Sequence, residues 1–505
     1  MGIAKLAENP ASADWHDRAR NVEFRQESFI NGRYARSTLS NRHFETVNPA
    51  TEGVIAKIPA GSSDDVETAV CAARSAFSSH WSAVSPDSRK AQLLRWADNL
   101  ESRANDLALR DCIEMGKPIK FAMADIVAGI RFIRFYAETA DKHSGDVAPT
   151  DPVRGITFTL PEPWGVVGAI VPWNFPFLTA CMAAGPALAA GNTVVLKPSE
   201  VSPSSALLMA EIASESGLPD GVINVVPGLG STVGAALAQH HDVDKLHFTG
   251  STATGRKMLM YSAESNGKAV MLEVGGKNPQ IVFEDAVNIA GLGEALSMAA
   301  FFNTGQVCVA RSRLIVHRRI AGRVIEQVRA AAEKLVAGDP LDSVTNYGPV
   351  SSQMQLDKIE YHVNAAIRAG AESILGGGRL KTPGYFFPPT ILTNVREDMP
   401  AVREEIFGPV VSIHTFDSED EAIELANATP FGLAATAWTT DVATSMKLVR
   451  RLQAGRVEIR ASASPASSLE LFSAEPFGQS GFGVLGGVRG IEPYLRWKGV
   501  EFVSG

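Results

Sequence analysis

Short apolar runs alternate with longer amphipathic segments from residue 155 onward. Apolar runs bounded by turn residues are typical of buried strands, and apolar residues three or four positions apart are typical of helices. The predicted strands cover residues 166–171, 193–196, 222–226, 245–248 and 270–272, and the predicted helices cover 179–190, 204–216, 232–240 and 255–263. This repeated strand–helix–strand order predicts a doubly wound α/β domain that binds its ligands at the carboxyl ends of the strands.

The regions on either side of this series have patterns of their own. Residues 1–60 form an irregular polar arm that leads into short strands, and residues 65–143 predict helices, including 88–111 and 122–143. A second α/β series follows, with strands at 313–316 and 410–416 and helices at 289–302, 321–336, 419–427 and 444–452. The break between the two series falls near 273–277, so residues close to it would flank an interdomain cleft.

Residues 165–196 carry no charged side chain over 32 positions, which exceeds the roughly 20 residues that span a bilayer. Pro172, Pro176 and Pro186 interrupt this stretch. A proline inside a helix removes a hydrogen bond and bends the chain. We therefore expect a buried strand, turn, helix and second strand rather than a membrane span.

Composition narrows the class of protein further. The chain has 505 residues, a net charge of −8 and a pI near 5.8, so no basic stripe is available for nucleic acid or an anionic membrane. Its four cysteines are too few to cross-link a chain of this length, and their spacing shows no metal-ligand pattern. The N-terminus lacks an apolar signal core. These features predict a cytoplasmic protein with sizeable cores and no metal site.

Cys308 and Glu273 are the strongest candidates for chemistry. Cys308 lies in a Gly-rich stretch 35 positions after Glu273, which itself precedes Gly275-Gly276. A thiol with a nearby carboxylate suggests a nucleophile and a general base, and backbone amides of a Gly-rich segment can favour a thiolate. The alternative is that Cys308 is a small buried apolar residue, as isolated cysteines often are.

Two glycine-containing turns are candidates for phosphate binding, because each follows a predicted strand and begins a helix. The first contains Gly230 and Gly234, with one residue too many before the last glycine for a dinucleotide fingerprint. The second begins at Gly250 and Ser251 and has the glycine spacing of a P-loop without its Gly-Lys-Ser/Thr ending. Nucleotide hydrolysis is therefore disfavoured, whereas binding of a pyrophosphate at a helix N-terminus fits. Either segment could also be a simple tight turn.

Two further motifs follow predicted strands. Lys197 and Glu200 lie three apart, where one cation and one acceptor could reach a ribose, although a solvated ion pair is the alternative. Asn174 stands between Pro172 and Pro176, which would fix its backbone and let its amide act as an oxyanion donor. A purely structural turn is the competing interpretation of this motif.

Six motifs in this order resemble the aldehyde dehydrogenase superfamily: Pro-Trp-Asn-Phe-Pro at 172–176, Leu-Lys-Pro-Ser-Glu at 196–200, Phe-Thr-Gly-Ser at 248–251, Leu-Glu-x-Gly-Gly-Lys at 272–277, Phe-x-Asn-x-Gly-Gln-x-Cys at 301–308 and Glu-Glu-Ile-Phe-Gly-Pro at 404–409. The likeness covers about residues 25–460. Met115-Gly116-Lys117-Pro118 and two other segments look most like the bacterial γ-glutamyl-γ-aminobutyraldehyde dehydrogenases.

The resemblance implies an α/β fold of two doubly wound Rossmann-like domains with a small β oligomerisation flap. Residues 1–143 and 160–275 would form the NAD-binding domain, 276–475 the catalytic domain, and 144–159 with 476–505 the oligomerisation segments of a homodimer or homotetramer. The partner would be a small-molecule aldehyde, and the cofactor would be NAD, with NADP possible.

The resemblance also implies roles for single residues. Cys308 would attack the aldehyde, Asn174 would hold the oxyanion and Glu273 would activate the water that hydrolyses the thioester. The residues implied at the cofactor are Trp173, Lys197, Glu200, Gly230, Gly234, Gly250, Ser251, Glu405 and Phe407. A carboxylate at Glu200 would repel a 2′-phosphate and so favour NAD.

The C-terminal part departs from the family pattern. Arg460 stands where Asn is usual, and the segment 476–481 is shortened by three residues that include a lysine. Ala183 and Leu485 replace a Lys and a Glu that pass protons in many relatives, so we expect this internal proton relay to be absent. Residues 461–474, rich in Ser and Ala, align with a loop that lines the aldehyde tunnel; they would either widen the pocket or impair activity.

Overall fold

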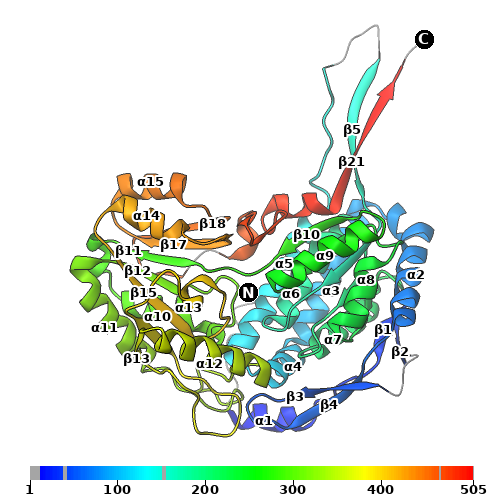
Figure 1. Ribbon diagram of the computed structural model, residues 1–505. Helices are drawn as coiled ribbons and strands as arrows, with labels where there is room; N and C mark the ends of the chain where they lie inside the picture. Colours follow the sequence, from blue (N-terminus) through cyan, green and yellow to red (C-terminus); the bar gives the residue numbers. More distant parts are fainter. Residues whose placement is uncertain (1–11, 38–41, 150–154, 466–467, 504–505) are drawn as a thin grey trace.

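The computed structural model describes residues 12–37, 42–149, 155–465 and 468–503. Two large sheets lie side by side, each with helices on both faces, and a two-stranded ribbon extends away from them (Figure 1). The predicted α/β class with two doubly wound units is confirmed. Within the described residues, none of the helices is both long and apolar enough to cross a membrane.

The first sheet has eight strands in the order β2-β1-β8-β7-β6-β9-β10-β20. Its strands are β1 (Ser28–Ile30), β2 (Arg33–Ala35), β6 (Val166–Ile170), β7 (Thr193–Lys197), β8 (Ile223–Val225), β9 (Lys245–Thr249), β10 (Ala269–Glu273) and β20 (Gly481–Phe482). The run from β8 to β10 is parallel and corresponds to the five predicted strands. The charge-free stretch forms β6, a turn, a buried helix and β7, as expected.

Two apolar layers hold helices on the two faces of this sheet. One face packs against α3 (Pro86–Ser102), α4 (Ala104–Met115), α5 (Ile119–Thr139), α6 (Pro176–Ala189) and α7 (Ser204–Glu215). The other packs against α2 (Ser63–Ser79), α8 (Ala235–Gln239) and α9 (Thr252–Glu264). Burial of these apolar faces is the main force that fixes the carboxyl ends of the strands relative to one another.

Several predicted helices differ from the structure. The single helix expected at 88–111 is wrong, because Arg103 leaves the helical region (φ −108°, ψ 17°) and separates α3 from α4. The bend keeps both helices against α5, and no glycine or proline marks it in the sequence. The helix expected at 232–240 begins instead as a π-helical turn at Gly230–Gly234, with α8 behind it. The polar arm contains the helix α1 (Ser12–Arg20), whose Trp15 is fully buried.

The second sheet has seven strands in the order β13-β14-β15-β12-β11-β17-β18. They are β11 (Pro279–Val282), β12 (Arg313–His317), β13 (Glu372–Leu375), β14 (Thr390–Thr393), β15 (Val410–Phe416), β17 (Ala434–Trp438) and β18 (Arg456–Arg460). The helices α10 (Leu292–Phe301) and α11 (Ala321–Ala332) cover one face, and α14 (Glu419–Asn427) and α15 (Val442–Arg451) cover the other. The helix α12 (Gln353–Arg368) was not predicted.

The chain passes from one sheet to the other beside Glu273. Strand β10 ends at Glu273 and β11 begins at Pro279, so five residues connect the two sheets. The C-terminal strand β20 returns to pair with β10, with Gly481 opposite Glu273. Glu273 therefore lies at the junction between the sheets. The residue ranges expected for the separate domains stay a prediction.

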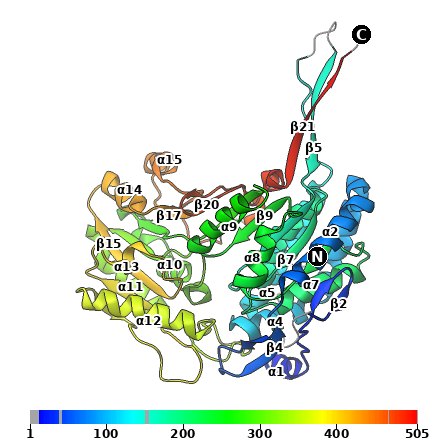
Figure 2. The ribbon, with the colours of Figure 1, turned by 45° about the vertical axis from the view of Figure 1, so that its right-hand side comes forward.

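The projecting ribbon consists of β5 (Ile156–Pro163) and β21 (Leu495–Phe502), paired antiparallel over their full lengths. Figure 2 shows that it stands clear of both sheets. The ribbon exposes Ile156, Leu160, Trp497 and Phe502 to solvent. Of the expected oligomerisation segments, residues 477–482 do not belong to this ribbon, since β19 (Phe477–Gly478) and β20 pair with strands of the main body.

Candidate active site

The Cys308 loop begins with a run of unusual backbone conformations. Helix α10 ends at Phe301, and Asn303 (φ 52°), Thr304 (φ 56°) and Gly305 (φ 68°) are all left-handed. Such a conformation is strained for a β-branched residue such as Thr304 and persists only where tertiary contacts fix it. The Thr304 hydroxyl donates to the Gly348 carbonyl at 2.8 Å, and a Cβ on Gly305 would lie 2.1 Å from the Gly408 carbonyl oxygen. This turn sets the direction in which the chain reaches Cys308.

Asn278 fixes the other side of the loop. Its Nδ2 donates to the carbonyls of Cys308 at 2.8 Å and Ala310 at 3.0 Å, and its Oδ1 accepts from the Ala434 amide at 3.0 Å. All three of these bonds use buried or half-buried groups, where geometry is well defined. The backbone of Cys308 is thereby attached to β17 of the second sheet.

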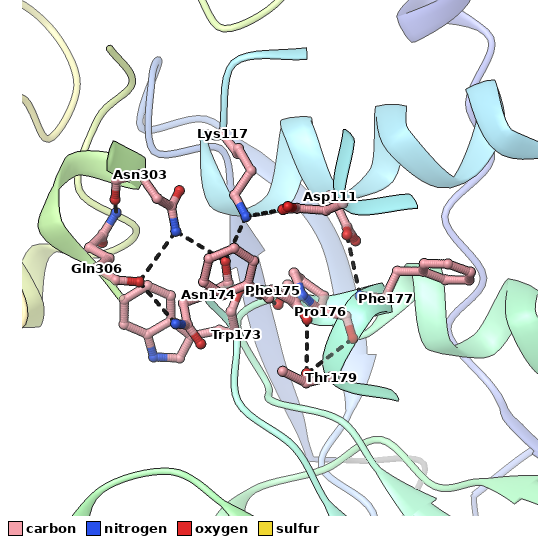
Figure 3. Close-up of polar contacts among 12 residues, drawn as sticks. Asp111, Lys117, Trp173, Asn174, Phe175, Pro176, Phe177, Thr179, Asn303 and Gln306 are labelled. Carbon is pink, nitrogen blue, oxygen red and sulfur yellow. Dashed lines mark hydrogen bonds and ion pairs between the residues drawn. The ribbon is translucent and has the colours of Figure 1, made fainter. Parts of the chain in front are cut away.

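Asn174 reaches the same loop from the first sheet. It follows β6 in the segment between Pro172 and Pro176, and it is buried. Its Nδ2 donates to the Gln306 carbonyl at 2.9 Å, two residues before Cys308, as Figure 3 shows. An amide nitrogen carries two hydrogens. One is committed to Gln306, which leaves the other able to donate to an oxygen bound beside Cys308.

A buried cation supports Asn174 from behind. Lys117 is 1% exposed, and its ammonium forms an ion pair with Asp125 and donates to the Asn174 main-chain carbonyl at 2.9 Å. The same ammonium lies 3.7 Å from the centre of the Phe175 ring. Asn303 donates to the Asn174 carbonyl as well, at 3.1 Å (Figure 3). Sequence reasoning gave Lys117, Asn278 and Asn303 no role.

Glu273 stands at the end of β10 with one carboxylate oxygen unsatisfied. Its Oε1 is buried and makes no hydrogen bond with any described residue. Burial raises the pKa of the Glu273 carboxyl well above its ordinary value, and the negative charge of Glu475 adds to the effect. A carboxyl with a raised pKa is a stronger base than a free carboxylate, which suits proton abstraction near neutral pH.

The Cys308 thiol is also perturbed by its surroundings. Burial raises its pKa to about 12, and the carboxylates of Glu405 and Glu273 contribute in the same direction. The thiol is therefore protonated at neutral pH in the free protein. Glu273 acts on the Cys308 thiol electrostatically, and the Asn174 amide is bound to Gln306, two residues before Cys308.

The predicted ribose-binding pair is assembled at the end of β7. The Lys197 ammonium, 2% exposed, lies 2.9 Å from the Glu200 carboxylate. Burial raises the pKa of Glu200, but the positive charge of Lys197 and backbone donors that include the Gly230 amide outweigh it and hold the pKa below its ordinary value. The end of β7 thus brings the ionised Glu200 carboxylate together with the Lys197 ammonium and the Gly230 amide.

Other predicted cofactor residues lie on the neighbouring strand ends. Ser251 caps α9 by accepting from the Thr254 amide at 3.3 Å, and Gly250 donates to the Glu273 carbonyl at 3.1 Å. Gly234 ends the π-helical turn that begins at Gly230. The exposed start of α9 presents free backbone N–H groups of the kind that bind phosphate.

The second sheet contributes Glu405 and Phe407 to the same cleft. Glu405 accepts from the Gly276 amide at 3.1 Å, and a Cβ on Gly275 would lie 2.2 Å from its carboxylate, so a side chain at position 275 would displace that carboxylate. The Phe407 ring meets the Trp173 ring edge to face at 5.4 Å. A cavity of about 790 Å³ is lined by the start of α9 at Thr252, by Lys358 of α12 and by Glu405, among others. Of the predicted cofactor residues, Glu405 lines this cavity, and Trp173 and Phe407 join the two halves of the molecule through their rings.

Comparison with known proteins identifies the class to which this arrangement belongs. The aldehyde dehydrogenase family profile matches residues 35–500. This chain belongs to the aldehyde dehydrogenase family. It is therefore an NAD(P)-dependent oxidoreductase, and the expected family and cofactor class are confirmed.

Curated relatives match this aldehyde dehydrogenase over most of its length. It is 42% identical over 447 residues to the NADP/NAD-dependent aldehyde dehydrogenase PuuC of Escherichia coli, which covers 88% of this chain and 90% of that protein. It is 41% identical over 477 residues to the mitochondrial benzaldehyde dehydrogenase of Antirrhinum majus, with coverage of 93% and 88%.

Solved structures confirm the fold. An indole-3-acetaldehyde dehydrogenase of P. syringae, in complex with NAD+, aligns with a TM-score of 0.95 at 40% identity, covering 98% of this aldehyde dehydrogenase and all of that chain. The γ-glutamyl-γ-aminobutyraldehyde dehydrogenase of Burkholderia cenocepacia aligns with a TM-score of 0.93 at 40% identity, with coverage of 98% and 99%. The likeness to that group, noted from sequence motifs, is therefore also found among structures.

The two positions expected to lack the proton relay lie in an apolar environment. Ala183 is fully buried in the cluster that also contains Met271 and Tyr136, and Leu485 packs against this cluster. The Leu485 backbone forms a pair of 2.9 Å hydrogen bonds with Ala474. Because both residues are uncharged, neither one leaves a buried charge without a partner. This fits the expectation that the Lys and the Glu of the relay are absent together.

Proposed function

We propose that this enzyme oxidises an aldehyde to a carboxylic acid through a covalent thioester on Cys308. The observation that supports this best is the bond from the Asn174 amide to the Gln306 carbonyl. It joins a donor from the first sheet to the nucleophile loop of the second and leaves a second amide hydrogen for the substrate oxygen.

In the first half of the reaction, the Cys308 thiol gives its proton to water, the sulfur attacks the carbonyl carbon, and the carbonyl oxygen takes the electron pair. The Asn174 amide and the Cys308 backbone N–H stabilise this oxyanion, and one such donor is worth roughly 2.7–4 kcal/mol in other enzymes. Bound NAD supplies the acceptor for the hydride that leaves the same carbon when the oxyanion collapses. The product on Cys308 is a thioester.

In the second half, Glu273 removes a proton from a water molecule that attacks the thioester carbon. Cys308 leaves as a thiolate, and the acid is released. The raised pKa of Glu273 suits it to this step. Because Ala183 and Leu485 are apolar, we infer that Glu273 then returns its proton to water in the substrate tunnel rather than through side chains.

We also propose NAD rather than NADP as the preferred cofactor. Lys197 and Glu200 form an ion pair at the end of β7, and Glu200 stays ionised. An ionised carboxylate accepts hydrogen bonds from ribose hydroxyls and repels a 2′-phosphate. The Escherichia coli relative is named as dependent on both cofactors, so kcat/KM should be measured with NAD and with NADP. A kcat/KM for NADP equal to that for NAD would contradict this preference.

The decisive experiment is NADH formation over a panel of aliphatic, aromatic and charged aldehydes. We expect turnover by the wild type and none by Cys308→Ala. Glu273→Gln should form NADH in a single burst and then stop, because its thioester cannot be hydrolysed. Release of an acyl-CoA in the presence of coenzyme A would instead identify an acylating enzyme. No turnover from a folded, NAD-saturated sample would indicate a binding or structural role.

The projecting ribbon supports a homodimer or homotetramer. An isolated two-stranded ribbon is only marginally stable in water, and this one exposes Trp497 and Phe502. A second copy that covers these side chains would remove the exposure. Light scattering should give a mass of two or four chains for the wild type and a lower mass for Trp497→Glu.

We place the enzyme in the cytoplasm. All four cysteines carry free thiols, which fits a reducing compartment. Cell fractionation tests this, and recovery with an organelle or the periplasm would contradict it.

A further inference from the structure

The turn at residues 405–407 has an unusual backbone conformation. Phe407 has a φ of 58°, which is an outlier for a residue with a large side chain and persists only where surrounding groups fix it. The Phe407 ring meets the Trp173 ring edge to face at 5.4 Å, and Trp173 follows β6 of the first sheet. The backbone at Phe407 therefore decides how the second half of the molecule faces the first at this point.

Gln355 fixes this turn from helix α12. Its Nε2 donates to two successive main-chain carbonyls, those of Ile406 at 2.9 Å and Phe407 at 2.8 Å. An amide nitrogen carries two hydrogens, so both are used. Gln355 is 8% exposed, and its main-chain amide donates at 3.3 Å to the hydroxyl of Ser352, which caps the helix. The donor therefore comes from a helix start that is itself fixed.

Two further residues of α12 reach the same turn. The Lys358 ammonium donates to the Glu405 carbonyl at 2.9 Å. Ile359 is fully buried, and a Cβ on Gly408 would lie 2.4 Å from its side chain, so the helix packs directly against the residue after Phe407. The first turns of α12 thus contact each residue of the turn and the glycine that follows it.

The segment that leads into α12 holds the Cys308 loop. The Ser351 amide donates to the side-chain oxygen of Gln306 at 2.8 Å, and Gln306 is fully buried. The turn and the loop also touch each other, since a Cβ on Gly305 would lie 2.1 Å from the Gly408 carbonyl oxygen. The start of α12 and the residues before it therefore support both the turn and the loop that carries the nucleophile.

This shared support matters for the proposed reaction, in which a hydride leaves the carbon that is bound to Cys308. Glu405 and Phe407 are the cofactor residues that the second sheet contributes, and Phe407 directly precedes the glycine that touches the Cys308 loop. The part of the cofactor beside Phe407 is thus the part that must receive the hydride. A misplacement of about 1 Å between reacting groups can slow a reaction by about 10²-fold.

We propose that Gln355 is a positioning residue for hydride transfer, because it holds the turn at 405–407 at a fixed place relative to the Cys308 loop. The inference rests on the proposed function, since it assigns a supporting residue to the same site. Gln355 acts through the carbonyls of Ile406 and Phe407 rather than on the substrate. Its loss should therefore misplace the nicotinamide end of the cofactor and leave the thiol and the adenine end as they are.

Gln355→Met tests this role, because methionine keeps the size of the side chain and removes both donors. Single-turnover NADH formation should become about 10–100-fold slower. NAD affinity, measured by calorimetry without aldehyde, should fall about three- to tenfold, whereas affinity for ADP, which lacks the nicotinamide half, should stay unchanged. Alkylation of Cys308 by iodoacetamide in the free enzyme should keep the wild-type rate, since the Ser351 bond remains. Gln353→Ala, at an exposed glutamine of the same helix, is the control and should match the wild type throughout.

Lys358→Met removes the third bond to the turn at an exposed position, and it should slow the same step by a smaller factor. It provides the test if Gln355→Met does not fold. Unchanged NADH formation in the folded variant would overturn the proposal, and so would equal losses of NAD and ADP affinity, which would indicate general damage.

The binding measurements separate this proposal from a failure of the proposed reaction. If the wild type oxidises no aldehyde but Gln355→Met weakens the binding of NAD and not of ADP, the positioning role stands and the reaction does not. If the wild type oxidises no aldehyde and the variant binds both nucleotides as the wild type does, the positioning role is overturned as well.

Discussion

The Asn174 side-chain amide donates to the main-chain carbonyl of Gln306 at 2.9 Å, across the boundary between the two sheets. This bond fixes the rotamer of Asn174 and so the direction of its second hydrogen. A donor that is held in place before the reaction stabilises a developing charge without reorganisation.

Replacing Asn174 should therefore slow the chemical step rather than weaken binding. For Asn174→Ala we expect kcat to fall by about 10²–10³-fold with little change in KM. Pre-steady-state NADH formation measures the step directly. Asn99→Ala, which removes an exposed amide on α3, is the control and should keep the wild-type rate. An Asn174→Ala enzyme with raised KM and unchanged kcat would show that the amide only binds substrate.

Lys117 and Asp125 form a buried pair whose loss should have two separable effects. Lys117→Met leaves the Asp125 carboxylate buried without a partner, and we expect about 3–5 kcal/mol less stability to unfolding. Adding Asp125→Leu should restore most of this stability. It should not restore kcat, because the Asn174 carbonyl still lacks its Lys117 donor. Denaturant unfolding and kcat, measured on both variants, distinguish support of Asn174 from a role in folding alone.

The sequence predicted the strands of both sheets more accurately than the helices. It also predicted the catalytic residues, but not the residues that hold them in place. Buried parallel strands are short apolar runs, so β6 to β10 could be located from pattern alone. The break at Arg103 and the π turn at Gly230 depend on packing against neighbours and leave no local signal. Cys308, Glu273 and Asn174 stand in short motifs, whereas Asn278 acts through carbonyls 30 and 32 positions away. Arg311 and Glu458 likewise approach each other only because β17 and β18 pair.

The raised pKa of Cys308 predicts a steep pH dependence of its alkylation. Below a pKa of about 12 the thiolate fraction rises about tenfold for each pH unit. In the free enzyme, iodoacetamide should react with Cys308 at a rate that still increases across roughly pH 7 to 9. Cys71→Ser provides the background, since Cys71 is exposed whereas Cys112 and Cys181 are buried.

Added NAD should move this alkylation profile to lower pH, because the positive charge of the oxidised nicotinamide favours the thiolate. NADH, which lacks this charge, is the matched control. A rate that is already constant near neutral pH in the free enzyme would show that the thiolate forms without the cofactor.

The variant Leu485→Glu tests whether the two proton-relay positions, 183 and 485, function only as a pair. Leu485 packs against an apolar cluster, so a lone carboxylate there would be surrounded by apolar side chains without a cation. We expect this variant to lose at least about 2 kcal/mol of stability and to hydrolyse its thioester more slowly. Adding Ala183→Lys supplies the missing charge and should recover part of the stability. Thermal unfolding measures the first effect, and single-turnover release of the acid measures the second. A clear rise in the hydrolysis rate with Leu485→Glu alone would mean that Glu273 already delivers its proton toward this side, and that exchange through the tunnel is not its route.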